Sequence, residues 1–253
     1  MIKVILQGCS GKMGGAITKL VEKEKEMVIV AGIDKKIEKD QKYPVYHSLD
    51  QCDRMSDVVV DCSSKEAIKE VLFYCVNKKK PLVICTTGYS KEQMEWIQKA
   101  STKTAVFQSA NMSEGINILR FMIRNTAPFF EKTGADIEIV EKHHRQKKDV
   151  PSGTAVLLAD EINQALGGRY VYDLNRGSGE RKENEIGFSS VRGGTIFGEH
   201  EIIFAGEDEV IRIKHTAYSR NVFAKGVIKA VKFIAGKQIG LYDMDNMMEE
   251  TEQ

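Results

Sequence analysis

The sequence predicts an α/β protein in which a parallel sheet is followed by a second, α+β domain. Up to about Asn111, short runs rich in Val and Ile alternate with helical stripes of apolar residues, a pattern typical of βαβ units. Beyond that point the rhythm changes. Strand-like segments separated by Gly-rich or acidic turns then indicate an antiparallel or mixed sheet.

The first half is expected to contain five strands and at least two helices. The strands are Lys3–Gln7, Met27–Ile33, Asp57–Asp61, Pro81–Cys85 and Lys103–Gln108. Between Met13 and Val21, apolar residues recur at i, i+3, i+4, i+7 and i+8, which predicts an amphipathic helix with one buried face. A second helix of similar spacing carries Ala67 to Val76.

The second half is expected to mix helices and strands. The helices are a segment around Ile116 to Ile123, Ser152 to about Leu166, and Val222 to Ala235; the strands are Asp136–Glu141, Ile186–Val191, His200–Ala205 and Val210–His215. Residues 167–185 are poor in large apolar side chains and predict a long exposed loop. We expect the last helix to stop at Gly236 with a left-handed cap, and the tail Asn246–Gln253 to be disordered.

Composition excludes several classes of protein. The chain has 253 residues, 42% hydrophobic and 29% charged, which suits one or two folded domains and argues against disorder or a coiled coil. Thirty-seven basic residues balance 36 acidic ones, so no global field favours nucleic acid or an anionic membrane. The five cysteines lack C-x-x-C spacing, as expected for reduced thiols. With no signal-peptide pattern and no long apolar run, a cytoplasmic location is expected.

A glycine-rich turn follows the first strand and opens the first helix. Its sequence is Gly8-Cys9-Ser10-Gly11-Lys12-Met13-Gly14. Backbone without Cβ can approach a pyrophosphate closely, and the free N–H groups at the helix start can bind its oxygens. The spacing is G-x-x-G-x-x-G and not G-x-G-x-x-G, so the pattern alone also fits an ordinary strand–helix turn. In this context it predicts dinucleotide binding.

Asp34 ends the second strand, twenty residues after Gly14, where a carboxylate can bind the adenosine ribose hydroxyls of NADH. Its neighbours Lys35 and Lys36 could instead meet the 2′-phosphate of NADPH, so use of both coenzymes is expected. The alternative is that Asp34 caps a turn and the lysines are solvated.

Two further polar turns lie at the carboxyl ends of predicted strands, where ligands of open α/β sheets bind. They are Thr86-Thr87-Gly88 and Ala110-Asn111-Met112. Either alone fits an ordinary turn, but together they could line the nicotinamide side of the site.

A basic cluster follows the strand that begins at Asp136. His143, His144, Arg145, Lys147 and Lys148 place several donors within six residues, which suits a small polyanionic substrate and proton donation near neutral pH. The alternative is a solvated basic loop. Adjacent histidines on a strand alternate sides, and no Cys or carboxylate pattern completes a zinc site, so no metal is expected.

The cluster leads directly into Pro151-Ser152-Gly153-Thr154, which opens an apolar helix. Ser152 is expected to be the N-cap, and Gly153 and Thr154 offer N–H groups without intrahelical acceptors. A carboxylate would bind there. Proton donors beside an anion-binding helix start predict a substrate pocket.

The segment Glu138–Ala155, EIVEKHHRQKKDVPSGTA, closely resembles the signature of the dihydrodipicolinate (4-hydroxy-tetrahydrodipicolinate) reductase family. The likeness extends over nearly the whole chain. It includes the glycine turn, Thr86-Thr87-Gly88, Asn111-Met112-Ser113-Glu114-Gly115-Ile116-Asn117, Val191-Arg192-Gly193-Gly194, Gly198-Glu199-His200, Ser219-Arg220 and Gly240-Leu241-Tyr242-Asp243-Met244. The sequence departs from the family pattern at Cys85, Cys62-Ser63-Ser64, Met112 and Val150.

This resemblance implies a cytosolic NAD(P)H-dependent oxidoreductase of diaminopimelate and lysine biosynthesis. It would reduce 4-hydroxy-tetrahydrodipicolinate, a small dicarboxylate, to tetrahydrodipicolinate. The implied fold is an N-terminal Rossmann-type parallel sheet, residues 1–113 with 221–253, plus a C-terminal α+β substrate and tetramerisation domain, residues 114–220. We expect a homotetramer formed through the strands of residues 186–215.

The resemblance also implies roles for individual residues. His143 matches the proton donor or acceptor and Lys147 a second donor, whereas His144, Gly153 and Thr154 match substrate-binding positions. The implied cofactor-binding residues are Gly8, Cys9, Ser10, Gly11, Lys12, Met13, Gly14, Asp34, Lys35, Cys85, Thr86, Thr87, Ser109, Ala110, Asn111 and Met112. Two alternatives stay open: a related two-domain dehydrogenase of another amino or hydroxy acid, and a non-catalytic dinucleotide sensor.

Overall fold

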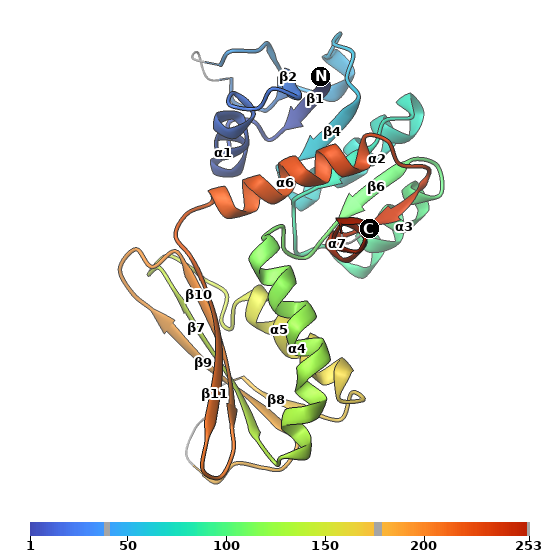
Figure 1. The fold of residues 1–253 in the computed structure, drawn as a ribbon. Helices are drawn as coiled ribbons and strands as arrows, with labels where there is room; N and C mark the ends of the chain where they lie inside the picture. The colour runs from blue at the N-terminus through green and yellow to red at the C-terminus, as the bar shows by residue number, and fades with distance from the viewer. Residues whose placement is uncertain (38–40, 175–178, 252–253) are drawn as a thin grey trace. The chain divides into compact units, whose positions relative to one another are not determined.

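The computed structural model describes residues 1–37, 41–174 and 179–251. The chain forms two compact units (Figure 1). The first comprises Met1–Glu114 and the segment from Arg220 onward, and the second is Gly115–Ser219. The chain therefore leaves the first unit and returns to it.

The first unit is built on a seven-stranded sheet in the order β12-β6-β5-β4-β1-β2-β3, and every adjacent pair is parallel. The strands are β1 Ile2–Gln7, β2 Met27–Ile33, β3 Val45–Tyr46, β4 Val58–Asp61, β5 Leu82–Ile84, β6 Ala105–Gln108 and β12 Gly240–Tyr242. All five predicted strands are present. The predicted Rossmann-type parallel sheet is confirmed.

Helices cover both faces of this sheet (Figure 1). Those packed on one face are α1 (Lys12–Val21), α6 (Asn221–Ile234) and α7 (Met244–Thr251); those on the other are α2 (Ile68–Lys78) and α3 (Lys91–Ser101), with short 3-10 turns at Leu49–Gln51 and Lys65–Ala67. In α1 the buried residues recur at i, i+3, i+4 and i+7, from Gly14 to Val21, so a single stripe faces the core.

The second unit contains a five-stranded mixed sheet in the order β11-β10-β7-β9-β8. The strands are β7 Asp136–His143, β8 Val171–Asp173, β9 Glu185–Arg192, β10 Gly198–Ala205 and β11 Val210–Ala217. β7, β9 and β8 are parallel, whereas β10 runs antiparallel to both β7 and β11. Helices α4 (Glu114–Lys132) and α5 (Gly153–Ala165) pack on the sheet around a third apolar core, which confirms the predicted α+β arrangement.

Three expectations were wrong in part. The predicted loop 167–185 contains β8, a three-residue strand that pairs in parallel with the start of β9; residues 175–178 of that loop lie outside the described residues. Gly236 does not adopt the left-handed conformation, because Ala235 keeps helical angles and the N–H of Lys237 donates to the carbonyl of Ile234. Up to Thr251 the tail is helical.

The tail is ordered by capping and burial. The side chains of Asp243 and Asn246 accept hydrogen bonds from each other's backbone N–H at the start of α7. Met244 and Met247 are buried in the core beside α6. The segment is short and strongly acidic toward its end, so its two buried methionines do not form a periodic pattern strong enough to predict a helix.

Among the described residues, none of the helices has the length and apolar character needed to cross a membrane.

Candidate active site

The glycine turn brings the end of β1 against the start of α1. Gly8 has a φ of +81°, a conformation that residues with a Cβ rarely adopt. A Cβ on Gly14 would lie 2.3 Å from the carbonyl oxygen of Gly8, so the helix can pack this close only with glycine at that position. Both glycines are thus required by the turn itself.

The turn leaves the N-terminus of α1 open to an anion. Gly11 is the N-cap and has no side chain to accept hydrogen bonds from the first-turn N–H groups, and that turn contains no acidic residue. Unpaired N–H groups and the positive end of the helix dipole are what a phosphate requires. Residues Gly8 to Gly14 therefore fit the pyrophosphate of a dinucleotide.

Asp34 lies beside this turn at the end of β2. Its carboxylate accepts the N–H of Ser10 at 3.0 Å and the N–H of Lys36 at 3.1 Å. The side chain of Ser10 in turn donates to the carbonyl of Lys36 at 2.8 Å. Asp34 thus braces the turn, as the alternative interpretation held, while it also lines a cavity.

That cavity has a volume of about 720 Å³, within the usual range of ligand pockets. Its lining includes Gly8, Gly11, Asp34, Lys35, Cys62, Ser63 and Ser64. Backbone donors, an acidic side chain and a lysine meet there, which fits the phosphate and ribose groups of NADH or NADPH. The side chain of Cys9 is buried and contributes to the core instead, and that of Lys12 is exposed.

A second cavity of about 160 Å³ gathers most of the residues predicted to line the nicotinamide side. It is lined by Met13, Cys85, Thr87, Ser109, Ala110, Asn111, Met112, Phe223 and Val227. Burial raises the pKa of the Cys85 thiol well above its usual value, so this sulfur is a packing group and not a nucleophile. Thr86 is not among the residues that line this cavity.

Thr86 faces Asp61, a residue that the sequence analysis did not select. Asp61 ends β4 and is fully buried; its carboxylate accepts hydrogen bonds from Thr86 Oγ1 at 3.3 Å, and from the N–H and Oγ of Ser63 at 3.1 and 2.5 Å. Burial raises its pKa despite these bonds. Asp61 therefore ties the loops after β4 and β5 together next to the cofactor cavities.

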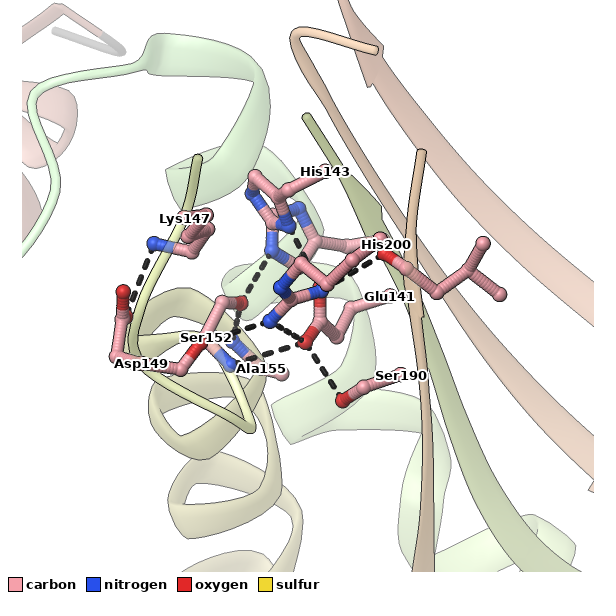
Figure 2. A network of polar contacts seen from close by, with 10 residues as sticks. Glu141, His143, Lys147, Asp149, Ser152, Ala155, Ser190 and His200 are labelled. Carbon is pink, nitrogen blue, oxygen red and sulfur yellow. Dashed lines mark hydrogen bonds and ion pairs between the residues drawn. The ribbon is translucent and has the colours of Figure 1, made fainter. Parts of the chain in front are cut away.

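In the second unit, Glu141 is the centre of a polar network at the end of β7 (Figure 2). Its carboxylate is fully buried and is held by donors from three segments: Arg192 at 2.6 and 2.8 Å, Ser190 Oγ at 2.6 Å, His143 Nδ1 at 2.6 Å and the N–H of Ser152 at 3.2 Å. Burial alone would raise the pKa of Glu141, but these hydrogen bonds lower it to about 2. Glu141 is therefore an anion at neutral pH.

His143 lies two residues further along β7 and faces the same side of the sheet as Glu141. Because an ionised carboxylate can only accept, Nδ1 must carry the proton that points at Glu141. Burial lowers the pKa of His143 despite the adjacent carboxylate. The imidazole is therefore neutral at pH 7, with Nε2 unprotonated. A Cβ on Gly198 would lie 3.1 Å from Nε2, so glycine leaves room beside this nitrogen.

His200 of β10 packs edge-on against His143, with ring centroids 5.1 Å apart (Figure 2). Its Nε2 hydrogen-bonds to Ser152 Oγ at 2.8 Å, and that oxygen also accepts the N–H of Ala155 at 3.2 Å. Ser152 is thus the predicted N-cap of α5, and it links the helix to the network. Burial lowers the pKa of His200 to about 3.

Lys147 and Asp149 lie on the other side of Ser152 from Glu141 in the close-up (Figure 2). Lys147 Nζ is 2.9 Å from Asp149 Oδ2, and its backbone N–H donates to the carbonyl of His144. His144 follows the last residue of β7, and Gly153 and Thr154 are the first two residues of α5. The structure thus brings His143, Lys147 and the start of α5 together around Ser152.

The sequence analysis missed most of the residues that support this site. Arg192 and His200 belong to motifs that matched the family but received no role. Ser190 appeared only within the predicted strand Ile186–Val191, and Glu141 only as the end of the strand Asp136–Glu141 and within the family signature. Within the described part of the chain, no group of three or more His, Cys, Asp or Glu side chains is arranged to hold a metal ion.

Family models match both units of the chain. The model described as "Dihydrodipicolinate reductase, N-terminus" matches residues 2–112, and "Dihydrodipicolinate reductase, C-terminus" matches residues 115–248. The chain belongs to the dihydrodipicolinate reductase family. The chain is therefore an NAD(P)H-dependent oxidoreductase, and the resemblance inferred from the sequence is confirmed.

Known members of the dihydrodipicolinate reductase family match nearly the whole length of the chain. The 4-hydroxy-tetrahydrodipicolinate reductase of Clostridium novyi is 48% identical over 250 residues, 98% of each chain. That of Caldanaerobacter subterraneus is 47% identical over 252 residues, 99% of each chain. The dipicolinate-bound dihydrodipicolinate reductase from Paenisporosarcina superposes with a TM-score of 0.81 at 25% identity, covering 96% of this chain and 97% of the other.

Proposed function

We propose that this protein reduces 4-hydroxy-tetrahydrodipicolinate to tetrahydrodipicolinate with NADH or NADPH, in lysine and diaminopimelate biosynthesis. The observation that carries the proposal is 48% identity, over 98% of both chains, to a protein of that activity. Five free cysteines are compatible with work in the reducing cytoplasm.

The cofactor would be held by the first unit. The N–H groups at the start of α1 would bind the pyrophosphate, Asp34 or Lys35 the adenosine ribose or its 2′-phosphate, and the residues after β5 and β6 the nicotinamide. When bound, the reduced nicotinamide supplies a hydride.

The second unit would supply the proton and neutralise the negative charge that develops on the substrate. In the overall reaction the substrate loses its hydroxyl as water and gains a hydride and a proton. Hydride addition to a conjugated imine leaves negative charge on the substrate, which a nearby proton donor must neutralise. The ammonium of Lys147 fits that role. His143 is neutral with its Nδ1–H fixed on Glu141, so its Nε2 fits an accepting role, in relaying or orienting the proton.

The substrate carboxylates would be bound at the start of α5. His144, Lys147 and the N–H groups of Gly153 and Thr154 combine donors with the positive end of a helix dipole, which favours an anion. A small dicarboxylate suits this site, and the Paenisporosarcina relative is a dipicolinate-bound structure.

The direct test is a coupled assay. Aspartate semialdehyde and pyruvate are condensed enzymatically, this protein and NADH or NADPH are added, and cofactor oxidation is followed at 340 nm. We expect oxidation that depends on both the protein and the condensation product. Cofactor binding without turnover would instead favour a dinucleotide sensor, and turnover only on another amino or hydroxy acid would favour a related dehydrogenase.

We further propose that the protein is a homotetramer assembled through residues 186–215. Strand β11 is an edge of the mixed sheet, and edge strands offer unpaired backbone groups to a partner. Val191, Val210 and Ile211 are large apolar side chains left exposed on these strands, which supports burial against another copy.

A further inference from the structure

Asp149 is a carboxylate that the proposed function does not use, yet it contacts the groups assigned to the substrate. Its Oδ2 lies 2.9 Å from Lys147 Nζ (Figure 2). The backbone N–H of Gly153, in the first turn of α5, also favours the charged form of the Asp149 side chain and helps to lower its pKa. A lysine ammonium and a helix N-terminus together form an anion site, and in this structure an anion of the chain itself is bound there.

We propose that Asp149 is an internal stand-in for a substrate carboxylate, which holds Lys147 and the start of α5 in place until the substrate displaces it. This inference rests on the proposed function, because it takes Lys147 and Gly153 as substrate-binding groups. It makes Asp149 a positioning residue that sets substrate affinity without taking part in the chemistry.

The contacts of Asp149 suit a group that can leave. Its side chain is 58% exposed and that of Lys147 is 22% exposed, and ion pairs this open to water are weak. Its backbone, in contrast, is fixed, because Arg192 Nη2 donates to the Asp149 carbonyl at 2.7 Å. The carboxylate can therefore rotate into solvent while the loop keeps its shape.

Glu141 provides the contrast within the same site. Glu141 is fully buried and bound by Arg192 through two nitrogens, so displacing it would leave a largely buried guanidinium without an anion. Of the two carboxylates, only Asp149 can be exchanged for a ligand at low cost. It is also charged at neutral pH: burial would raise its pKa, but Lys147 and the N–H groups of Asp149 and Gly153 lower it.

An internal competitor reduces apparent affinity in proportion to its occupancy, since a ligand binds only the fraction of molecules in which the site is free. If Asp149 holds the site in roughly 70–90% of molecules, as a weak intramolecular ion pair would, removing its charge strengthens dicarboxylate binding about three- to tenfold. Once substrate is bound the competitor has left, so turnover at saturation is not altered by it.

The experiment compares Asp149→Asn with the wild type and with Asp208→Asn. Asp208 is an exposed carboxylate in the turn between β10 and β11, at the opposite end of β10 from His200, so its substitution removes the same charge outside the site. Pyridine-2,6-dicarboxylate binding is measured by calorimetry, and KM and kcat by the coupled assay. For Asp149→Asn we expect Kd and KM to fall about three- to tenfold and kcat to change by less than twofold. Asp208→Asn should match the wild type.

Unchanged or weaker dicarboxylate binding by a folded Asp149→Asn protein would overturn the inference. If that variant does not fold, a crystal structure of the wild type with pyridine-2,6-dicarboxylate decides: a ligand carboxylate must replace Asp149 on Lys147 Nζ, and an intact Lys147–Asp149 pair overturns the proposal. A wild type that neither turns over the condensation product nor binds the dicarboxylate would contradict the proposed function itself, which separates the two failures.

Discussion

Lys147 and His143 differ in what their surroundings allow them to do. Lys147 presents an ammonium beside the start of α5, whereas His143 is neutral and directed by Glu141. We expect Lys147→Ala and His143→Gln each to lower kcat by roughly 10²- to 10⁴-fold, the usual scale of general acid–base catalysis, with cofactor affinity unchanged. The measurements are steady-state kinetics and cofactor titration.

A solvated basic loop would give a different result, because surface substitutions rarely cost more than about 0.5 kcal/mol. Near-normal turnover of Lys147→Ala, with normal melting temperature and cofactor binding, would remove Lys147 from the mechanism. The proton would then come from water, with Nε2 of His143 relaying or orienting it.

Burial of His200 predicts a pH dependence of stability. The usual pKa of histidine, 6.5, falls to about 3 at this position, because burial and the neighbouring His143, His215 and Lys147 oppose the charged form more than Glu141 favours it. Below pH 6.5, His200 therefore binds a proton in the unfolded chain, whereas in the folded chain it stays neutral down to about pH 3. Acidification from pH 7 to pH 5 should thus cost about 2 kcal/mol of the free energy of unfolding through this residue.

The His200→Gln variant tests this assignment, because glutamine can still hydrogen-bond to Ser152 but does not titrate. Urea unfolding at pH 7, 6 and 5 should show a loss about 2 kcal/mol smaller in the variant than in the wild type. His47→Gln is the control, since His47 is an exposed histidine. Equal losses in His200→Gln and the wild type would place the acid sensitivity elsewhere.

The preference for NADH or NADPH also depends on single residues. Asp34 favours the ribose diol of NADH and repels a 2′-phosphate, and Lys35 and Lys36 offset that repulsion. We expect kcat/KM for NADH and NADPH to differ by less than about tenfold, or about 1.4 kcal/mol. Asp34→Ala should shift the ratio toward NADPH. Asp34 also braces the glycine turn, so its loss would weaken binding of both coenzymes alike. The ratio of the two kcat/KM values is therefore the quantity to measure. A preference of more than about a thousandfold for either coenzyme in the wild type would contradict the expectation that Asp34 and the two lysines offset each other.

At the scale of elements, two adjacent glycines of α1 differ in how closely they approach the glycine turn. A Cβ on Gly14 would meet backbone atoms of Gly8 and Cys9 at 2.3 and 2.7 Å, whereas a Cβ on Gly15 would have no neighbour within 4 Å. Gly14→Ala should lower stability by about 1–3 kcal/mol and weaken cofactor binding at least about tenfold, because the turn must shift.

Gly15→Ala is the matched control in the same helix. It should bind cofactor normally and leave stability unchanged or raised by up to about 1 kcal/mol, since alanine favours the helical state. Fluorescence titration of the cofactor and thermal unfolding measure both variants. Equal behaviour of Gly14→Ala and Gly15→Ala would mean that the close approach of α1 to the turn is unimportant for binding.

At the scale of the whole molecule, the prediction concerns assembly. The exposed apolar side chains of β9 and β11 and the open edge of β11 predict a homotetramer. Multi-angle light scattering at micromolar concentration should give four times the mass of one chain. A monomer mass would contradict the assembly and leave the catalytic assignment standing. Replacing Ile211 by Lys should weaken the tetramer, because a charge would then have to be buried in the interface.

The sequence by itself determined the features that arise from neighbouring residues. Amphipathic spacing located α1 and α2, and runs of Val and Ile located the first five long strands of the parallel sheet, because burial of one face or of a whole strand imposes its period on adjacent positions. The glycine turn, the Ser152 cap and the His143–Lys147 segment are equally local. Short or weakly periodic elements such as β8, β12 and α7 could not be predicted from the sequence, because pairing or packing with distant residues stabilises them.

Only the tertiary structure decided how the site is supported. Glu141 and Arg192 are 51 residues apart, and Ser152 and His200 are 48 apart; they meet because β7 lies between β9 and β10 in the mixed sheet. That strand order brings Arg192 and Ser190 to Glu141 and keeps it ionised, which fixes the proton of His143 on Nδ1. Burial within the sheet keeps His200 neutral. The conformation of the loop between β7 and α5 in turn places Asp149 on Lys147. Side-chain identities supply the chemistry, but protonation and contact depend on burial and neighbours that local sequence patterns do not specify.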